Sequence, residues 1–403
     1  MKSSILAALL ALGGSANSSS NNSFSYQAST IIPWTPSNST SVDQSTIFNG
    51  TYFLADRTNR GVHVIDLANN RQTTIIGGFT GLATVNGTAN AAKSGPNGLL
   101  VLADRNELYA SDSGGSIKVI DLVTNSTVAN ITLDSVERAD EMAYDHTTGT
   151  VVCTIPNEIP PRLAVISAKY RSITGYITFT NASSLKQPAW NSINKQFYVS
   201  VPSTGTNPGG EIAVIDVNAL NITNVLPLPQ CIPAGIVFGP NQHLFVGCSQ
   251  DQILTYNISN SLVLDVTTGN VIANISGIAG VGQVAYNHWS GYYFVSAYQN
   301  LENGSSTGAP LPQLAIIGAN TNVLLQTIPT DNLTAHSVAF DPVTDNVVVP
   351  ISAEGLVVYS VTNSSVNSTS GSTPSRSSGG SSKIVNNALS YVGLAVFFTI
   401  MLF

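Results

Sequence analysis

Charged side chains are scarce in this sequence of 403 residues. Asp, Glu, Lys and Arg together make up 9% of the chain, and the acids outnumber the bases to give a net charge of −7. A protein that binds nucleic acid needs a concentrated basic surface to neutralise phosphates. The composition therefore argues against nucleic acid as a partner.

The motifs of the common enzyme classes are also missing. The sequence contains no GxSxG nucleophile turn, no HExxH zinc motif and no glycine-rich phosphate loop. The histidines at 63, 146, 243 and 288 are scattered without the spacing of a zinc site. We therefore expect no catalytic residues and a non-catalytic role.

Only three cysteines occur, so one stays unpaired if a single disulfide forms. Cys231 and Cys248 flank two expected antiparallel strands, and in an oxidising compartment we expect them to form that disulfide. Cys153 would then be a buried free thiol. The alternative is three free cysteines that pack as small apolar side chains.

The N-terminus has the composition of a secretory signal. Lys2 supplies a positive charge, Ile5 to Leu12 form a short apolar run, and small residues at 14–16 suit cleavage. The run is shorter than the roughly 20 residues that a membrane-spanning helix needs. We predict a signal peptide at 1–16 and an extracellular mature chain.

The C-terminus carries a second processing signal. Ser378, Gly379 and Gly380 precede a polar spacer and an apolar tail at 384–403 that ends without basic residues. This is the pattern of a glycosylphosphatidylinositol (GPI) attachment signal, in which the lipid replaces the tail. We expect one of these three residues to carry the anchor on the cell membrane, with a cell-wall location as a further expectation. A tail-anchored helix is the alternative.

Asn-x-Ser/Thr sequons are frequent, which agrees with export and predicts a glycoprotein. Attached glycans would supply the solubility that charge normally gives. The sequons lie at Asn17, Asn21, Asn38, Asn49, Asn86, Asn125, Asn130, Asn181, Asn221, Asn257, Asn274, Asn303, Asn332, Asn363 and Asn367.

Between the two ends one apolar motif returns seven times. It appears as GVHVIDLANN from Gly61, SIKVIDLVTN from Ser116 and EIAVIDVNAL from Glu211, and it recurs about every 49 residues. Shorter alternating runs rich in Val, Ile, Tyr and Phe precede and follow it. Four short strands in a repeat of this length are typical of a propeller blade. We predict an all-β fold, a β-propeller of seven four-stranded blades, with six or eight blades as alternatives.

The expected propeller spans 45–362. Its last repeat lacks an obvious fourth strand, and Ser29–Trp34 in the N-terminal segment 17–44 is a candidate to supply it and close the ring. Otherwise blade one begins at Ser45–Asn49 and the ring closes differently. The Ser/Thr/Asn-rich segment 363–383 has too few apolar residues to fold, so we interpret it as a stalk that ends at the attachment site.

Two stretches resemble a known repeat family. ELYASDSGGSIKVIDLVTNSTVANITL (107–133) and QFYVSVPSTGTNPGGEIAVIDVNALNITNVLPLP (196–229) resemble the YVTN-type β-propeller family, and the similarity covers roughly 45–362. It implies the fold but no single function. More distantly, ADRTNRGVHVID (55–66) resembles NHL-type repeats and the gluconolactonase/senescence-marker propellers. That resemblance implies a divalent cation held by carboxylates and amides at the channel mouth.

Propeller ligands commonly bind where the innermost strands converge on the central channel. Aligning these strands gives two rings of equivalent residues: Asn97, Asp140, Lys186, Ala234, Gly282 and His336, followed by Gly98, Glu141, Gln187, Gly235, Gln283 and Ser337. The candidate ligand-binding residues are Asn97, Asp140, Glu141, Gln187, Gln283 and His336. Polar residues also line water-filled channels that bind nothing, and Arg138 is placed to pair with Asp140 or Glu141.

These observations favour a monomeric surface protein that binds a glycan, a small ligand or another protein on its loop face, with no cofactor. The alternative is a lactonase-like hydrolase in which Glu141, Asp140 and Asn97 hold Ca²⁺ and His336 assists proton transfer. A third hypothesis is a structural wall component whose channel has no ligand.

Overall fold

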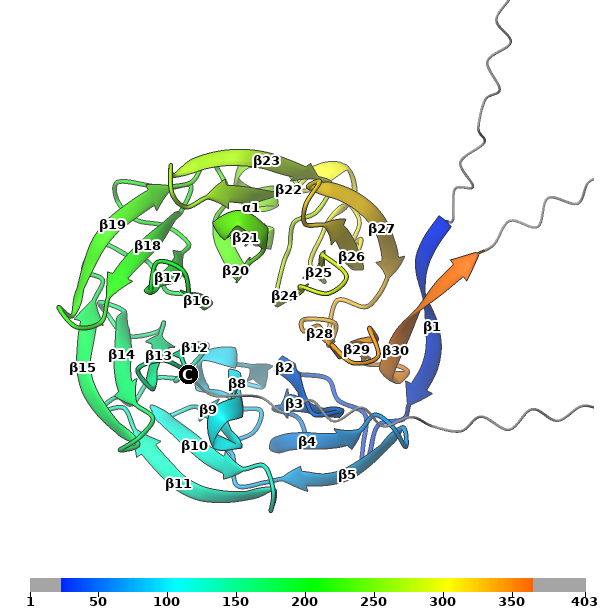
Figure 1. Cartoon of the computed structure of the whole chain (residues 1–403), viewed down its shortest axis with the longest axis horizontal. Helices are drawn as coiled ribbons and strands as arrows, with labels where there is room; N and C mark the ends of the chain where they lie inside the picture. Colours follow the sequence, from blue (N-terminus) through cyan, green and yellow to red (C-terminus); the bar gives the residue numbers. More distant parts are fainter. Residues whose placement is uncertain (1–22, 365–403) are drawn as a thin grey trace, which may run out of the picture. The chain divides into compact units, whose positions relative to one another are not determined.

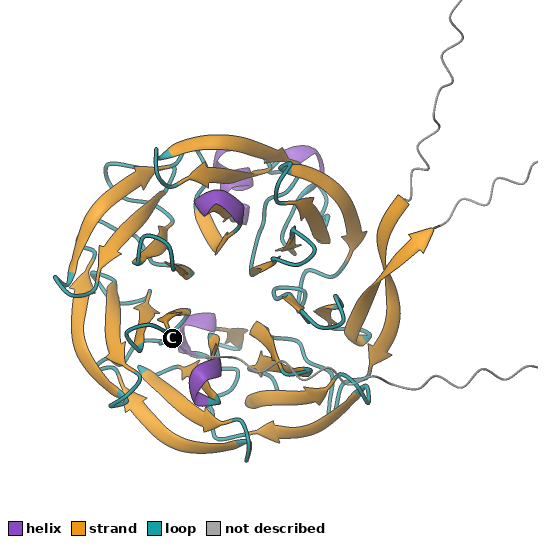
Figure 2. Cartoon of the chain, in the orientation of Figure 1, coloured by secondary structure: helices purple, strands orange, loops and turns teal. Residues whose placement is uncertain are grey.

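A computed structural model describes residues 23–364, which form one compact unit. Seven four-stranded antiparallel sheets are arranged around a central axis, as in a seven-bladed β-propeller (Figure 1). Helices are short and few in this part of the chain (Figure 2). The expected signal peptide, attachment residues 378–380 and apolar tail lie outside the described residues, as does all of the expected stalk except its first two residues.

In blades one to six the chain runs from the innermost to the outermost strand. Blade one contains β2 (Val42–Phe48), β3 (Thr51–Asp56), β4 (Gly61–Asp66) and β5 (Arg71–Ile76); blade two contains β8 (Leu99–Leu102), β9 (Glu107–Asp112), β10 (Ser116–Asp121) and β11 (Ser126–Thr132); blade three contains β12 (Met142–Asp145), β13 (Thr150–Ile155), β14 (Arg162–Ser167) and β15 (Ser172–Thr178).

Blade four contains β16 (Pro188–Asn191), β17 (Gln196–Val201), β18 (Glu211–Asp216) and β19 (Asn221–Pro227); blade five contains β20 (Pro233–Phe238), β21 (His243–Cys248), β22 (Asn260–Asp265) and β23 (Asn270–Ser276); blade six contains β24 (Val284–Asn287), β25 (Tyr292–Ala297), β26 (Gln313–Gly318) and β27 (Val323–Pro329). The connecting loops add a hairpin, β6 (Thr84–Val85) with β7 (Thr88–Ala89), one helix, α1 (Gln250–Tyr256), and 3-10 turns at Ala91–Lys93, Ala103–Arg105, Pro240–Gln242 and Glu302–Gly304.

Blade seven joins the two ends of the propeller. It contains β28 (Ala339–Phe340), β29 (Val347–Ile351) and β30 (Gly355–Ser364), and β1 (Ser23–Ile32) pairs antiparallel with β30 as its fourth strand. The propeller therefore begins at Ser23, earlier than the expected residue 45. The sequence left two ways to close the ring as alternatives: a closing strand from the N-terminal segment, or a blade one that begins near Ser45. Both features are present, as β1 and as β2.

The core lies between neighbouring blades. In β3, Tyr52 to Ala55 are all buried, because both faces of a middle strand pack against other strands. Aromatic rings bridge the blades, as where Tyr198 of blade four meets Phe238 of blade five edge to face at a centroid distance of 5.1 Å. These contacts fix the innermost strands, and hence the residues that precede them, around the axis.

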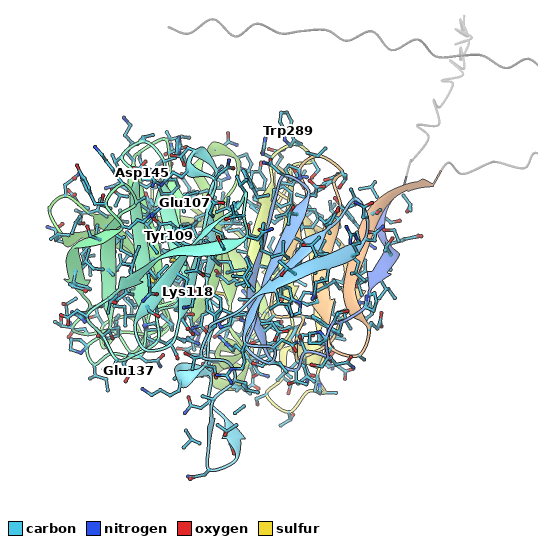
Figure 3. All side chains as sticks on the ribbon, turned by 90° about the horizontal axis from the view of Figure 1, so that it is seen from below. Glu107, Tyr109, Lys118, Glu137, Asp145 and Trp289 are labelled. Carbon is cyan, nitrogen blue, oxygen red and sulfur yellow. A yellow bond between two sulfur atoms is a disulfide. The ribbon has the colours of Figure 1, made fainter. Side chains whose placement is uncertain are left out.

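The propeller has two different faces. One face carries the longer connections that precede each innermost strand, with Glu137 among them, and we call it the loop face (Figure 3). The opposite face carries the short turns between the first and second strands of the blades, including Asp145 and Trp289, and we call it the turn face. Within residues 23–364 no helix is long and apolar enough to cross a membrane.

Candidate functional site

The site is a depression at the loop-face end of the central channel. It has two lobes of about 330 and 370 Å³, and the lobes share five lining residues: Glu141, Lys186, Tyr298, Gln299 and His336. We call this depression the mouth cavity. Both volumes are at the lower end of the range of about 300–1,000 Å³ that is typical of small-molecule sites.

Most of the first predicted ring reaches this cavity. Asp140, Lys186, Ala234, Gly282 and His336 line one or both lobes, and Asn97 contacts the lining residue Arg57. In the second ring Glu141 lines both lobes, whereas Gln187 and Gln283 line neither. Gln283 is used deeper in the channel, where its side chain binds the backbone N and O of Ser45 at 3.0 and 2.8 Å.

Glycines in these rings allow neighbouring blades to approach closely. A Cβ atom on Gly98 would collide with the carbonyl oxygen of Asp140 in the next blade. The same substitution at Gly282 would collide with the carbonyl oxygen of His336. The absence of a side chain at these positions therefore brings the backbones of successive blades into direct contact around the mouth.

The first ion pair of the cavity joins Arg57 to Asp43, two residues that the sequence analysis did not single out. Arg57 also donates from Nε and Nη2 to Oδ1 of Asn97, at 3.0 and 2.7 Å. Burial alone would raise the pKa of the Asp43 carboxyl, but Arg57 and nearby cations hold that pKa below its usual value. Asp43 is therefore an anion whose charge Arg57 neutralises.

A second ion pair joins Arg138 to Asp140, as expected, with 2.6 Å between Nη2 and Oδ2. Both side chains are largely buried, with exposed fractions of 11% and 5%. The Nε atom of Arg138 is buried and has no hydrogen-bond partner among the described residues. This guanidinium thus has one buried donor that no protein group satisfies.

Glu141 is the most unusual group in the cavity. It is 8% exposed, and its Oε1 accepts a hydrogen bond from Nε2 of Gln44 at 3.2 Å. Its Oε2 is buried without a partner in the described structure. Burial, followed by the nearby carboxylate of Asp140, raises the pKa of Glu141 to about 8, so the carboxyl group is mainly protonated at neutral pH.

Two aromatic rings form one wall of the mouth cavity. Tyr298 packs edge to face on His336, with 4.9 Å between ring centroids. Nδ1 of His336 lies 3.4 Å from Oδ1 of Asp43, yet burial lowers the pKa of the imidazole and favours its neutral form. The wall is therefore uncharged at neutral pH.

The residues proposed for Ca²⁺ do not suit a divalent cation. Oδ1 of Asn97 already accepts two hydrogen bonds from Arg57, and Asp140 is paired with Arg138. Residues 23–364 contain no group of three His, Cys, Asp or Glu side chains arranged to hold a metal. A cation at these oxygens would also have to displace two arginines that carry the same sign of charge.

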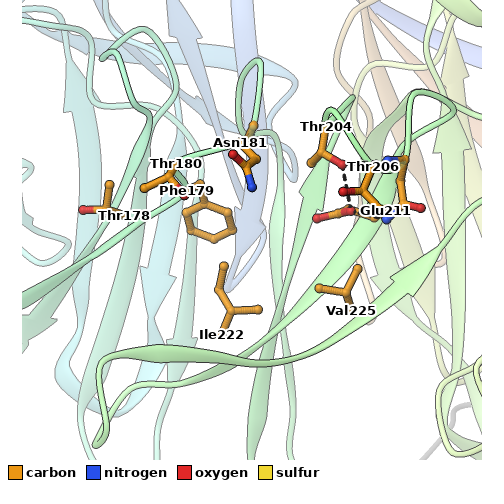
Figure 4. Close-up of a pocket in the computed structure, with 11 residues that line it drawn as sticks. Thr178, Phe179, Thr180, Asn181, Thr204, Thr206, Glu211, Ile222 and Val225 are labelled. Carbon is orange, nitrogen blue, oxygen red and sulfur yellow. Dashed lines mark hydrogen bonds between the residues drawn. The ribbon is translucent and has the colours of Figure 1, made fainter.

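A second cavity of about 320 Å³ lies on the outside of the ring, where blades three and four meet (Figure 4). Glu211 closes one end, and its Oε2 accepts hydrogen bonds from Thr204 and Asn207 at 3.2 and 2.6 Å. Phe179 and Ile222 line the middle. The polar groups of Glu211 are thus used within the protein, which makes this cavity a weaker candidate than the mouth cavity.

The cysteine pairing agrees with the sequence. Cys231 and Cys248 form a disulfide between the segment that leads into β20 and the end of β21. Cys153 is a fully buried free thiol, and burial raises its pKa above the usual value. Cys153 is therefore protected from solvent and from metal ions.

Comparison with known proteins supports the fold. No protein-family model matches the chain, and no curated protein sequence does. The structure is similar to that of hydrazine synthase from Kuenenia stuttgartiensis, with a TM-score of 0.63 and 11% identity over 82% of this chain and 98% of that chain. A chain of the mitotic checkpoint complex gives a TM-score of 0.63 and 12% identity, with coverage of 89% and 99%. Such low identity shows the propeller fold alone.

Proposed function

We propose that this chain is a non-catalytic β-propeller of the YVTN type, held outside the cell by a GPI anchor, that binds a small polar ligand or a glycan in the mouth cavity. One observation carries the proposal. An open depression contains buried polar atoms without protein partners, on Arg138 and Glu141. Such atoms cost free energy unless water or a ligand satisfies them, so they favour a binding site.

The direction of the chain suits a surface receptor. Strand β30 runs from Gly355 on the loop face to Ser364, and its far end projects on the side of the turn face (Figure 3). A lipid attached near residues 378–380 would tether the propeller by the turn face. The mouth cavity then points away from the membrane, where external ligands reach it.

The expected glycosylation sites are accessible. Eleven sequon asparagines lie in the part of the chain whose side chains are described, and ten of them are exposed: Asn38, Asn49, Asn86, Asn130, Asn181, Asn221, Asn257, Asn274, Asn303 and Asn332. Asn125 is half-buried. This exposure supports an extracellular glycoprotein, because a sequon must lie on the surface to carry a glycan.

The ligand part of the proposal is tested by filling the mouth cavity. Gln299 lines both lobes, so Gln299→Trp should abolish binding in a screen of soluble glycans and small polar molecules. Ser192→Trp places the same side chain in an exposed turn of the opposite face and should leave binding unchanged. Equal binding by both variants and the unmodified protein would exclude the mouth cavity as the site.

The location is tested on intact cells. A phospholipase C specific for phosphatidylinositol should release the protein into the medium, because it cuts the lipid of a GPI anchor. Retention after this treatment, together with release by detergent, would instead support the tail-anchored helix.

A further inference from the structure

Lys186 differs from the other cations of the mouth cavity. It lines both lobes, and no ion pair joins it to an acid among the described residues. Arg57 is neutralised by Asp43, and Arg138 by Asp140. The ammonium group of Lys186 is thus the one uncompensated cation among the residues that line this cavity.

Glu141 also lines both lobes, but it does not neutralise the positive charge of Lys186. Burial keeps the carboxyl group of Glu141 mainly protonated at neutral pH. Its second oxygen, Oε2, is buried without a partner, as is Nε of Arg138. The lining contains one further acid that has no ion pair among the described residues, the exposed Asp251, which borders one lobe only. Within the part that both lobes share, the cavity therefore offers one unpaired positive charge beside two buried polar atoms that lack hydrogen bonds.

We propose that the ligand of the mouth cavity is an organic monoanion, a carboxylate on a hydroxylated carbon skeleton, and that Lys186 binds the carboxylate. This inference rests on the proposed function and names its ligand class. A single uncompensated cation matches one negative charge, whereas a phosphate dianion would leave an excess charge in a partly buried site. Hydroxyl groups of the ligand suit the polar lining residues Gln299, Ser41 and Gln250.

The test is a calorimetric titration of the purified protein with four probes: D-glucuronate, D-glucose, acetate and inorganic phosphate. We expect glucuronate to bind at least tenfold more tightly than the other three. Glucose tests the need for charge, and acetate tests the need for hydroxyl groups. Phosphate, titrated at a pH above its second pKa so that the dianion prevails, tests the preference for one charge. The inference is overturned if glucose, acetate or phosphate binds as tightly as glucuronate or more tightly. It is also overturned if glucuronate does not bind.

Lys186→Gln should weaken glucuronate binding at least tenfold, and Lys186→Arg, which keeps the charge, should stay within a few-fold of the unmodified protein. Lys195 is an exposed lysine in a turn of the opposite face, so Lys195→Gln serves as the control and should bind normally. Unchanged glucuronate affinity in Lys186→Gln would overturn the role of Lys186. If a neutral ligand from the wider screen still binds and Gln299→Trp blocks it, the proposed function stands and only this inference fails.

Discussion

The side-chain amide of Gln326 binds both backbone groups of Tyr26. Oε1 accepts a hydrogen bond from the backbone N of Tyr26, Nε2 donates to its carbonyl oxygen, and both distances are 2.8 Å. Gln326 lies in β27 of blade six, and Tyr26 lies in β1, the N-terminal strand that completes blade seven. One side chain thus connects the closing strand to the blade beside it, in addition to the pairing of β1 with β30.

Replacing this glutamine should weaken the closure of the ring. Gln326→Ala removes two half-buried hydrogen bonds and leaves the backbone groups of Tyr26 without those partners, so we expect a loss of roughly 1–3 kcal/mol in the free energy of unfolding. Denaturant unfolding measures this loss, and hydrogen exchange should show faster exchange in β1. Gln27 is an exposed neighbour in the same strand, and Gln27→Ala should be close to neutral. Equal stability of the two variants would contradict the role of Gln326.

The disulfide should stabilise the fold although it closes a short loop. Cys231 and Cys248 are separated by 17 residues, and a loop of this size corresponds to about 3 kcal/mol in the chain-entropy description. We expect the Cys231→Ala/Cys248→Ala variant to lose about that much of the free energy of unfolding, which denaturant unfolding shows as a lower midpoint concentration. Cys153→Ala leaves the disulfide intact and serves as the cysteine control. A double variant as stable as the unmodified protein would show that local packing alone holds this segment.

Glu141 should make stability depend on pH. Its pKa is raised to about 8 in the folded state, above the unfolded value of 4.5, so the folded state retains a proton that the unfolded state loses. Stability from this group is complete below about pH 4.5, falls as the pH rises, and is lost once the pH passes about 8. Glu141→Gln keeps an acceptor for Gln44 and cannot ionise. We therefore expect the stability of the unmodified protein relative to this variant to fall between pH 5 and pH 8, as measured by denaturant unfolding.

Other acids change stability in the opposite direction, which is why the comparison with Glu141→Gln is needed. Arg57 and neighbouring cations lower the pKa of Asp43, so its contribution is present above the unfolded pKa and is lost in acid. Subtracting the two pH profiles removes contributions that both proteins share. A difference that stays constant from pH 5 to pH 8 would mean that Glu141 ionises normally in the folded state.

The fold could be predicted from the sequence because each blade repeats the same local pattern. Alternating apolar residues specify short strands, and polar or glycine residues specify the turns between them. The register of these strands also predicted that Asp140, Glu141 and His336 approach one mouth, and all three line the cavity. The same register could not show that Gln187 and Gln283 stay out of it while Glu141, at the equivalent position, enters it. That difference depends on contacts with other blades, such as the hydrogen bonds of Gln283 to Ser45.

The residues that the sequence analysis missed depend on the ring as a whole. Asp43 and Gln44 occupy the ring positions of blade one within β2, but the rest of that strand lacks the alanine–aromatic ending that most of the other innermost strands share. Arg57 reaches Asn97 from a loop between the second and third strands, across a sequence separation of 40 residues. Such contacts follow from the closure of seven blades around one axis, which no local pattern specifies.

The glycines of the channel rings should be intolerant of even one added methyl group. In Gly98→Ala the new Cβ would collide with the carbonyl oxygen of Asp140, so blades two and three would have to separate where they form the mouth. Because backbone atoms cannot move aside as a flexible side chain can, we expect a loss of about 1–3 kcal/mol in the free energy of unfolding. Gly77→Ala is the matched control, since nothing lies within 4 Å of the added atom and Gly77 has no positive φ.

The displaced Asp140 would also disturb its pair with Arg138, so ligand binding in the mouth cavity should weaken in Gly98→Ala and not in Gly77→Ala. Normal stability and binding in Gly98→Ala would mean that the blades are not held in contact at this point.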